Sequence, residues 1–122
     1  MSKKYSKDHE WVEIGDDGIA TIGITDFAQK ELGDVVYVEL PELDSDIKQD
    51  SEVAVVESVK AASDVKTPIS GQVVAVNEAL NDEPEQVNTD PEGEAWFFKL
   101  KPADISELDV LMDKSEYEDF TG

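Results

Sequence analysis

Apolar and polar residues alternate in short stretches along this chain, a pattern that predicts a β-protein. If residues 51–59 are extended, their Val, Ala and Glu side chains point alternately to the two faces of the segment. A second run of small and apolar residues follows Lys60 and ends before Pro68. Two such runs across a tight turn predict a hairpin over about residues 51–67, with Lys60 at its tip. The turn lacks the Asn-Gly or Asp-Gly pair of a two-residue hairpin loop, so its type is left open.

Further strands are expected where apolar runs lie between clusters of Gly, Pro, Asn and Asp. The strongest of these runs is residues 35–40, which ends at Pro41. The aromatic residues of the last run are expected to fill the core rather than to bind a ligand. The other strands are expected at residues 11–14, 19–23, 72–77 and 96–100.

Helices are expected in two places. Thr25 has the side chain of an N-cap for a short helix over residues 26–32, and Gly33 follows its last turn. A C-terminal helical segment is expected over about residues 106–120. Its expected capping pairs are Ser106 with Asp109 and Ser115 with Glu118.

The chain has 122 residues, and we expect it to form one domain over residues 1–122. Its hydrophobic residues, 39% of the total, are enough for a modest core. No apolar run approaches the length of a membrane span. Residues 1–5 carry no apolar stretch behind their charges, so neither a secretory signal nor a transit peptide is expected. A cytoplasmic protein is therefore expected, or a mitochondrial-matrix protein if the chain is a processed eukaryotic form.

Thirty Asp and Glu residues against ten Lys residues give a formal net charge of -20. This charge repels phosphate backbones and anionic lipid, which argues against nucleic-acid and membrane partners. It favours encounters with basic patches on partner enzymes. A well-solvated surface, or adaptation to salt, accounts for the same charge equally well.

The sequence contains no set of residues that predicts an active site. It has no Cys, so thiolate metal sites and catalytic thiols are excluded. His9 is the single histidine and has no second metal ligand or nucleophile near it in the sequence. Phosphate-binding loops and nucleophile elbows are absent as well. We therefore expect neither an enzyme nor a metal site.

Lys60 is either a solvated turn residue or an amine presented for covalent modification. Its neighbours decide between the two. The stretch from Glu57 to Asp64, Glu-Ser-Val-Lys-Ala-Ala-Ser-Asp, closely resembles the lipoylation site of glycine cleavage system H proteins. Biotin carrier domains differ, with Met where this chain has Val59 and Ala61, and lipoyl domains of 2-oxo acid dehydrogenases have an acidic residue in place of Val59.

The resemblance to H proteins extends over most of the chain. Glu92 is a small departure, because the family usually has an aromatic residue after the proline at this place. The segments that carry the resemblance are Tyr5–Trp11 with its His9-Glu10-Trp11 signature, residues 23–29, 32–41, 57–64, 68–71, 74–77 and 96–100.

The resemblance implies a mainly β fold, a barrel-sandwich hybrid of antiparallel sheets with short peripheral and C-terminal helices. It also implies lipoate bound covalently to Lys60 as N6-lipoyllysine. The protein would then be a shuttle that carries the aminomethyl group from glycine decarboxylase to aminomethyltransferase and is reoxidised by dihydrolipoyl dehydrogenase. The remaining partner would be the lipoate-attaching enzyme, and the protein is expected to be a monomer.

Two groups of residues are expected near the attachment site. Glu57, Ser58 and Asp64 are expected to serve recognition around the lysine, and His9 and Glu10 to line a cleft for the loaded arm. Two alternatives remain at this stage. One is an H-like protein that acts mainly as a lipoyl donor or relay, and the other is an interaction domain without lipoate.

Overall fold

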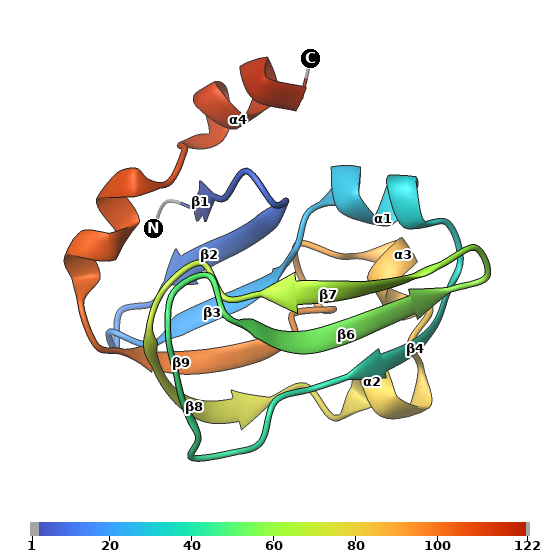
Figure 1. Ribbon diagram of the computed structural model, residues 1–122, viewed down its shortest axis with the longest axis horizontal. Helices are drawn as coiled ribbons and strands as arrows, with labels where there is room; N and C mark the ends of the chain where they lie inside the picture. The colour runs from blue at the N-terminus through green and yellow to red at the C-terminus, as the bar shows by residue number, and fades with distance from the viewer. Residues whose placement is uncertain (1–2, 122) are drawn as a thin grey trace.

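The computed structural model describes residues 3–121. These residues form two antiparallel sheets with short helices at their edges (Figure 1). The larger sheet has six strands in the order β1-β2-β3-β9-β8-β5, and the smaller has three in the order β4-β6-β7. The strands are β1 (Lys3–Tyr5), β2 (Glu10–Ile14), β3 (Ala20–Ile24), β4 (Val35–Glu39), β5 (Asp46–Ile47), β6 (Glu52–Ser58), β7 (Ala62–Lys66), β8 (Gly71–Val76) and β9 (Phe98–Pro102).

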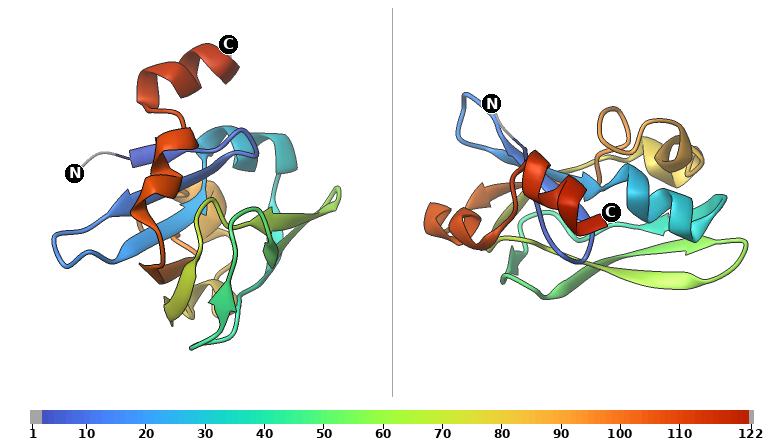
Figure 2. Two further views of the ribbon diagram at one scale, coloured as in Figure 1. Left: turned by 60° about the vertical axis from the view of Figure 1, so that its left-hand side comes forward. Right: turned by 90° about the horizontal axis from the view of Figure 1, so that it is seen from above.

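The helices are short and lie around the sheets. Helix α1 lies near the free end of the β6–β7 hairpin, and α4 lies at the edge of the molecule beside β1 (Figures 1 and 2). In the described part of the chain, no helix is long and apolar enough to cross a membrane. The helices are α1 (Asp26–Leu32), α2 (Ala79–Asp82), α3 (Gln86–Thr89), the 3-10 helix η1 (Ile105–Val110) and α4 (Lys114–Thr121).

The prediction of a mainly antiparallel β fold with short helices is confirmed. The two sheets pair separately over residues 3–121 and do not join into one closed barrel. Their apolar faces bury a common core that includes Val56 of β6 and Phe98 of β9. Phe97 and Phe98 are fully buried, so the expected role of the aromatics in the core holds. Strand β9 begins at Phe98 and not at Trp96, which packs against a smaller cluster around Tyr5.

The hairpin expected over about residues 51–67 is present as β6 and β7. The two strands pair from Glu52 opposite Lys66 to Glu57 opposite Ala62. Within β6 the period-two pattern holds, because Ala54 and Val56 are buried while their neighbours are at least partly exposed. Lys60 therefore lies in the turn between the strands.

Helix α1 has the predicted bounds and caps. The Thr25 hydroxyl accepts a hydrogen bond from the Ala28 backbone N–H at 3.2 Å, and Gly33 ends the helix with a positive φ of 83°. Its buried residue is Gln29, a polar side chain that the apolar pattern did not single out. Gln29 can be buried because its side chain is hydrogen-bonded to a polar partner, Asn88.

The predicted C-terminal helix is interrupted. Residue Met112 leaves the helical path to pair with Tyr5, and the two backbones exchange hydrogen bonds of 2.7 and 2.8 Å. This pairing extends the sheet beyond β1 and separates η1 from α4. A long-range strand contact thus overrides the helical pattern of residues 106–120.

The predicted capping pairs of this segment were wrong, because each N-cap lies two residues earlier than expected. In η1 the Asp104 carboxylate accepts from the Ser106 backbone N–H at 3.0 Å. Before α4, Asp113 and Glu116 form a reciprocal capping box, with hydrogen bonds of 2.8 and 3.0 Å. Asp caps a helix as well as Ser does, and both residue types occur near the start of each helix, so the sequence alone did not decide which one is the N-cap.

Candidate functional site

The turn that carries Lys60 is closed by the Ser58 side chain. The Ser58 hydroxyl accepts from the backbone N–H groups of Lys60 and Ala61, each at 3.2 Å, and the Ser58 backbone N–H donates to the Ala61 carbonyl at 2.8 Å. This side-chain bridge replaces the Asn-Gly or Asp-Gly chemistry that the turn lacks. Lys60 is exposed at the tip of a turn with a defined backbone.

The tip is not a free loop, because it is hydrogen-bonded to the residues that follow α1. The Val59 backbone N–H donates to the Asp34 carbonyl at 3.0 Å, and Val35 of β4 pairs with Ser58. The hairpin end, the C-terminus of α1 and the start of β4 therefore form one structural unit.

The side chain of Asn88 also stabilises this unit, through hydrogen bonds to α1, Gly33 and β4. Its side-chain N–H₂ donates to the Gly33 carbonyl at 2.8 Å and to the Gln29 side-chain oxygen at 3.0 Å. Its side-chain oxygen accepts from the Val35 backbone N–H at 2.8 Å. Asn88 thus brackets Asp34, the residue to which Val59 is bonded. Sequence reasoning missed this clamp, since an Asn in a turn carries no sign of a partner 53 residues away.

The side chain of Lys60 lies against a position that has no side chain. A Cβ atom at Gly33 would lie 3.1 Å from Lys60 Cε and 3.8 Å from Nζ. The absent side chain leaves room for the lysine stem along the end of α1. The positive φ of Gly33 requires glycine for the backbone as well.

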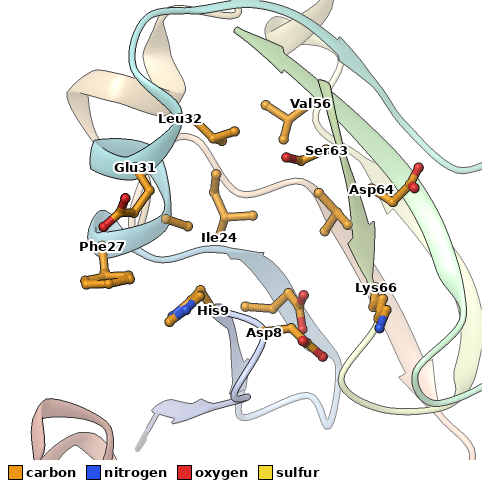
Figure 3. Close-up of a pocket in the computed structure, with 13 residues that line it drawn as sticks. Asp8, His9, Ile24, Phe27, Glu31, Leu32, Val56, Ser63, Asp64 and Lys66 are labelled. Carbon is orange, nitrogen blue, oxygen red and sulfur yellow. The ribbon is translucent and has the colours of Figure 1, made fainter. Parts of the chain in front are cut away.

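A cleft of about 450 Å³ opens between α1 and β7, and Leu32 and Ser63 line it (Figure 3). Its wall is mainly apolar, and its titratable groups comprise four carboxylates, one ammonium and one imidazole. Among the described residues, no three His, Asp or Glu side chains are placed to hold a metal ion. The lining residues are Asp8, His9, Glu10, Ile24, Phe27, Ala28, Glu31, Leu32, Val56, Ser63, Asp64, Val65 and Lys66.

Glu10 is the buried acid of this cleft, with 3% of its surface exposed. The Ser6 hydroxyl donates to its carboxylate at 2.6 Å and accepts from its backbone N–H at 3.1 Å. The pKa of Glu10 is raised to about 7, mainly by burial and in part by Asp8, although hydrogen bonds from Ser6 and the Lys66 backbone oppose the rise. A carboxyl group with this pKa changes charge near neutral pH, and a cation beside it would favour the charged form.

His9 lies next to Glu10 in a strained and enclosed setting. Its φ is 70°, which is uncommon for a residue with a side chain. Its Nδ1 is hydrogen-bonded to the Tyr117 hydroxyl at 2.7 Å, and its ring packs against Phe27 and Phe120. Burial lowers the pKa of His9, although the carboxylate of Asp8 opposes the shift.

The C-terminal helix reaches this side of the molecule through Tyr117. The Tyr117 hydroxyl is also 2.7 Å from the Thr25 hydroxyl, which caps α1. One phenol therefore connects α4, the N-cap of α1 and His9. Nothing in the sequence pattern singled out Tyr117 for this position, since it is 108 residues from His9.

The predicted site residues fall into two regions. Glu57 and Ser58 lie with Lys60 at the hairpin tip, with Glu57 half-buried. His9 and Glu10 lie in the cleft, and Asp64, from the other strand of the hairpin, also lines it. The hairpin thus contributes to the cleft through β7 and through Val56 of β6, and Lys60 is not among the lining residues.

Comparisons with known proteins agree on one family. A model described as Glycine cleavage H-protein matches residues 3–122. A glycine cleavage system H protein of Rhodospirillum rubrum is 58% identical over 123 residues, which cover 100% of this chain and 98% of the relative. One of Thermotoga maritima is 55% identical over 118 residues, which cover 97% of this chain and 94% of the relative.

The fold leads to the same family. The crystal structure of a glycine cleavage system H protein from Mycobacterium marinum superposes with a TM-score of 0.91 at 37% identity. The match covers 99% of this chain and 97% of that one. The resemblance noted in the sequence is confirmed, and the chain belongs to the glycine cleavage H-protein family.

Proposed function

We propose that this protein is the lipoyl carrier of a glycine cleavage system, with lipoate in amide linkage to Lys60. The observation that carries the proposal is an exposed lysine on an anchored hairpin tip, beside a cleft with a buried carboxylate, in a chain of this family. The protein would act as a carrier and not as an enzyme.

The attachment step needs access to the lysine nitrogen. The neutral Nζ of Lys60 attacks the carbonyl carbon of an activated acyl group, the C–N bond forms, and the bond to the activating group breaks as one proton leaves the nitrogen. The exposure of Lys60 and the defined turn around it suit this reaction. A rigid tip also lowers the entropy lost when a partner holds the lysine in place.

The residues around Lys60 and in the cleft fit an arm of this kind. The empty position at Gly33 gives the lysine stem a path beside the end of α1. Leu32 and Ser63 line the cleft near that end, and apolar side chains such as Phe27 cover much of its wall (Figure 3). An apolar wall with a few polar groups is typical of a site for a small organic group.

When bound, lipoate would supply a disulfide that accepts the aminomethyl group made by glycine decarboxylase. Aminomethyltransferase would take the group onward, and dihydrolipoyl dehydrogenase would reoxidise the resulting dithiol. The protein contributes attachment, orientation and recognition. Tethering raises the effective concentration of the carried group once a partner has docked. The acidic surface, with a formal charge of -20, favours partners that have basic patches.

We assign the cleft to the carried amine. A cationic ammonium buried without a partner is expensive, so a carboxylate must meet it. Glu10 is the first choice, since it is 3% exposed and its neighbour Ser6 holds it in place. Asp64 lines the same cleft from β7. His9 would hold the backbone and close the cleft on the α4 side through its bond to Tyr117.

The test of attachment is mass spectrometry of the natively expressed protein, followed by peptide mapping around Lys60. We expect the mass of one lipoyl group, located on Lys60 and absent from the other nine lysines. A lipoyl group on another lysine, or none after incubation with a competent attaching enzyme, contradicts the proposal. A lipoylated protein that transfers its acyl group to other lipoyl enzymes, and fails in reconstituted glycine cleavage, would instead be a lipoyl donor.

A further inference from the structure

Strand β4 breaks the alternation expected of a strand with one buried face. The register between β4 and β6 shifts between Val35 and Tyr37, which is the mark of a β-bulge. Val35 and Val38 are buried, whereas Val36 and Tyr37 between them are 54% and 48% exposed. The bulge therefore turns two consecutive apolar side chains toward solvent, where a regular strand would have buried one of them.

These two side chains lie beside the hairpin tip. Val35 pairs with Ser58, Tyr37 pairs with Glu57, and the bulged Val36 lies between those pairs. Val59, the next residue of the turn, is 68% exposed. We call Val36, Tyr37 and Val59 the tip patch.

The other exposed large hydrophobic residues of the described chain lie on other elements or loops. Single exposed apolar residues are ordinary, but a group next to a reactive side chain indicates a contact surface. Bulges are common next to functional sites, where they redirect side chains. The tip patch is also held rigidly, because Asn88 fixes both sides of Asp34 and Asp34 binds Val59.

The two segments of chain that contain the tip patch are acidic. In residues 31–39 and 55–64, Lys60 is the one basic residue against five carboxylates. A partner with an apolar face and a border of Lys or Arg complements this arrangement. The carboxylates are Glu31, Asp34, Glu39, Glu57 and Asp64.

We propose that the tip patch is the docking surface for the enzyme that acylates Lys60, and this rests on the proposed function. The acylating enzyme works at Nζ itself, so its active site must cover the atoms around the lysine stem. An enzyme that works at the far end of the attached arm is separated from the tip by the length of that arm. We therefore assign the apolar residues beside the turn that carries the lysine to the attachment step.

The experiment compares lysine substitutions inside and outside the tip patch. Val36→Lys and Tyr37→Lys are made in the unmodified protein, and Val110→Lys, at a residue 75% exposed on η1, is the matched control. The purified lipoate-attaching enzyme is supplied with lipoate and ATP. The initial rate of the mass increase on Lys60 is measured against protein concentration, and thermal melting verifies that each variant is folded.

We expect the KM for Val36→Lys and Tyr37→Lys to rise about tenfold or more, with kcat within about twofold of wild type, because the loss is in docking. The KM of Val110→Lys is expected to stay within about twofold. Val36→Thr keeps the β-branched shape and replaces one methyl group by a hydroxyl without adding charge, so a smaller rise of a few-fold in its KM supports the apolar contact.

A KM for the patch variants equal to that of Val110→Lys would overturn the proposal. So would patch variants that are acylated normally and then lose aminomethyl transfer, since the patch would then serve an enzyme that uses the arm. Failure of the wild-type protein itself to accept an acyl group at Lys60 would have a different meaning, because it overturns the proposed function. Normal acylation of wild type with impaired acylation of both patch variants supports the docking surface.

Discussion

The hairpin tip and the cleft are built in opposite ways. The turn at the tip is closed by hydrogen bonds between residues at most three apart, the Val59 backbone N–H anchors it to Asp34, and its lysine is exposed. The cleft joins segments from distant parts of the chain, and its key acid, Glu10, is 3% exposed. Attachment of an arm requires access by another enzyme, whereas retention of a labile cation requires exclusion of water. Under the proposed function, the protein would meet these two needs in different regions.

This difference predicts how substitutions behave. A change at the tip should alter chemistry or docking with little effect on stability, because few contacts depend on the side chain. A change in the cleft should alter both the stability of the fold and the retention of the carried amine, because buried polar groups are hydrogen-bonded to the rest of the structure. The following predictions test this separation, from the largest expected effect to the smallest.

Replacing Lys60 with Arg should abolish attachment and leave the fold intact. The guanidinium keeps the positive charge but does not accept the acyl group. We expect no mass increase with the attaching enzyme, no activity in reconstituted glycine cleavage, and a melting temperature close to that of wild type. Replacement of Lys66, another hairpin lysine, with Arg is the control and should leave attachment at Lys60 unchanged. Wild-type levels of glycine cleavage from Lys60→Arg would contradict the assignment.

Replacing Glu10 with Gln should shorten the life of the loaded carrier. Removing the charged acceptor from a buried site costs about 1.5–3 kcal/mol, so ammonia should be lost roughly tenfold to a hundredfold faster. The measurement is the rate of ammonia release from the methylamine-loaded protein without partner enzymes. Glu13→Gln, on the same strand but outside the cleft, is the control. Equal decay of Glu10→Gln and wild type would remove Glu10 from the site.

The pH dependence of unfolding should also report on Glu10. Its pKa in the folded protein is about 7, above its ordinary value of 4.5, so the folded state favours the protonated form. The protonated Glu10 side chain therefore contributes to the free energy of unfolding. This contribution is fully present below pH 4.5 and is lost as the pH rises through 7. Relative to Glu10→Gln, the wild type should lose up to roughly 3 kcal/mol between these values. Denaturant titrations at several pH values measure it, and parallel curves for the two proteins would contradict the burial argument.

Replacing Tyr117 with Phe should loosen the cleft on the α4 side. The phenol makes hydrogen bonds of 2.7 Å to His9 and Thr25, so its loss should cost about 1–2 kcal/mol of unfolding free energy. Ammonia release from the loaded variant should be accelerated, while the rate of attachment at Lys60 stays the same. Tyr37→Phe, at an exposed tyrosine, controls for loss of a hydroxyl and should melt as wild type does. A slower rate of attachment at Lys60 in Tyr117→Phe would contradict the functional separation of the hairpin tip and the cleft.

The smallest effects are expected at two carboxylates of the hairpin, Glu57 near the tip and Asp64 at the cleft. Glu57→Ala and Asp64→Ala should each slow attachment by a few-fold, because charged pairs near a surface contribute about 1 kcal/mol or less. Mass shift against time measures the rate. Unchanged rates in both variants would mean that these carboxylates serve solvation and that recognition depends on other groups.

Local patterns in the sequence were sufficient for several parts of this structure. The β6–β7 hairpin with Lys60 in its turn, and helix α1 with Thr25 and Gly33 at its ends, follow from residues a few positions apart. Period-two alternation and capping chemistry act over such distances, which is why one sequence predicts them. The assignment of lipoate to Lys60 stays a prediction that mass spectrometry decides.

Tertiary structure decided the features that depend on distant partners. The break between η1 and α4 arises because Met112 pairs with Tyr5, and no local pattern records that contact. The clamp at Asn88 has partners 53 to 59 residues away, and Tyr117 meets His9 across 108 residues. A pKa depends on the water and charges that packing leaves around a group, so only the folded chain raises that of Glu10 to about 7.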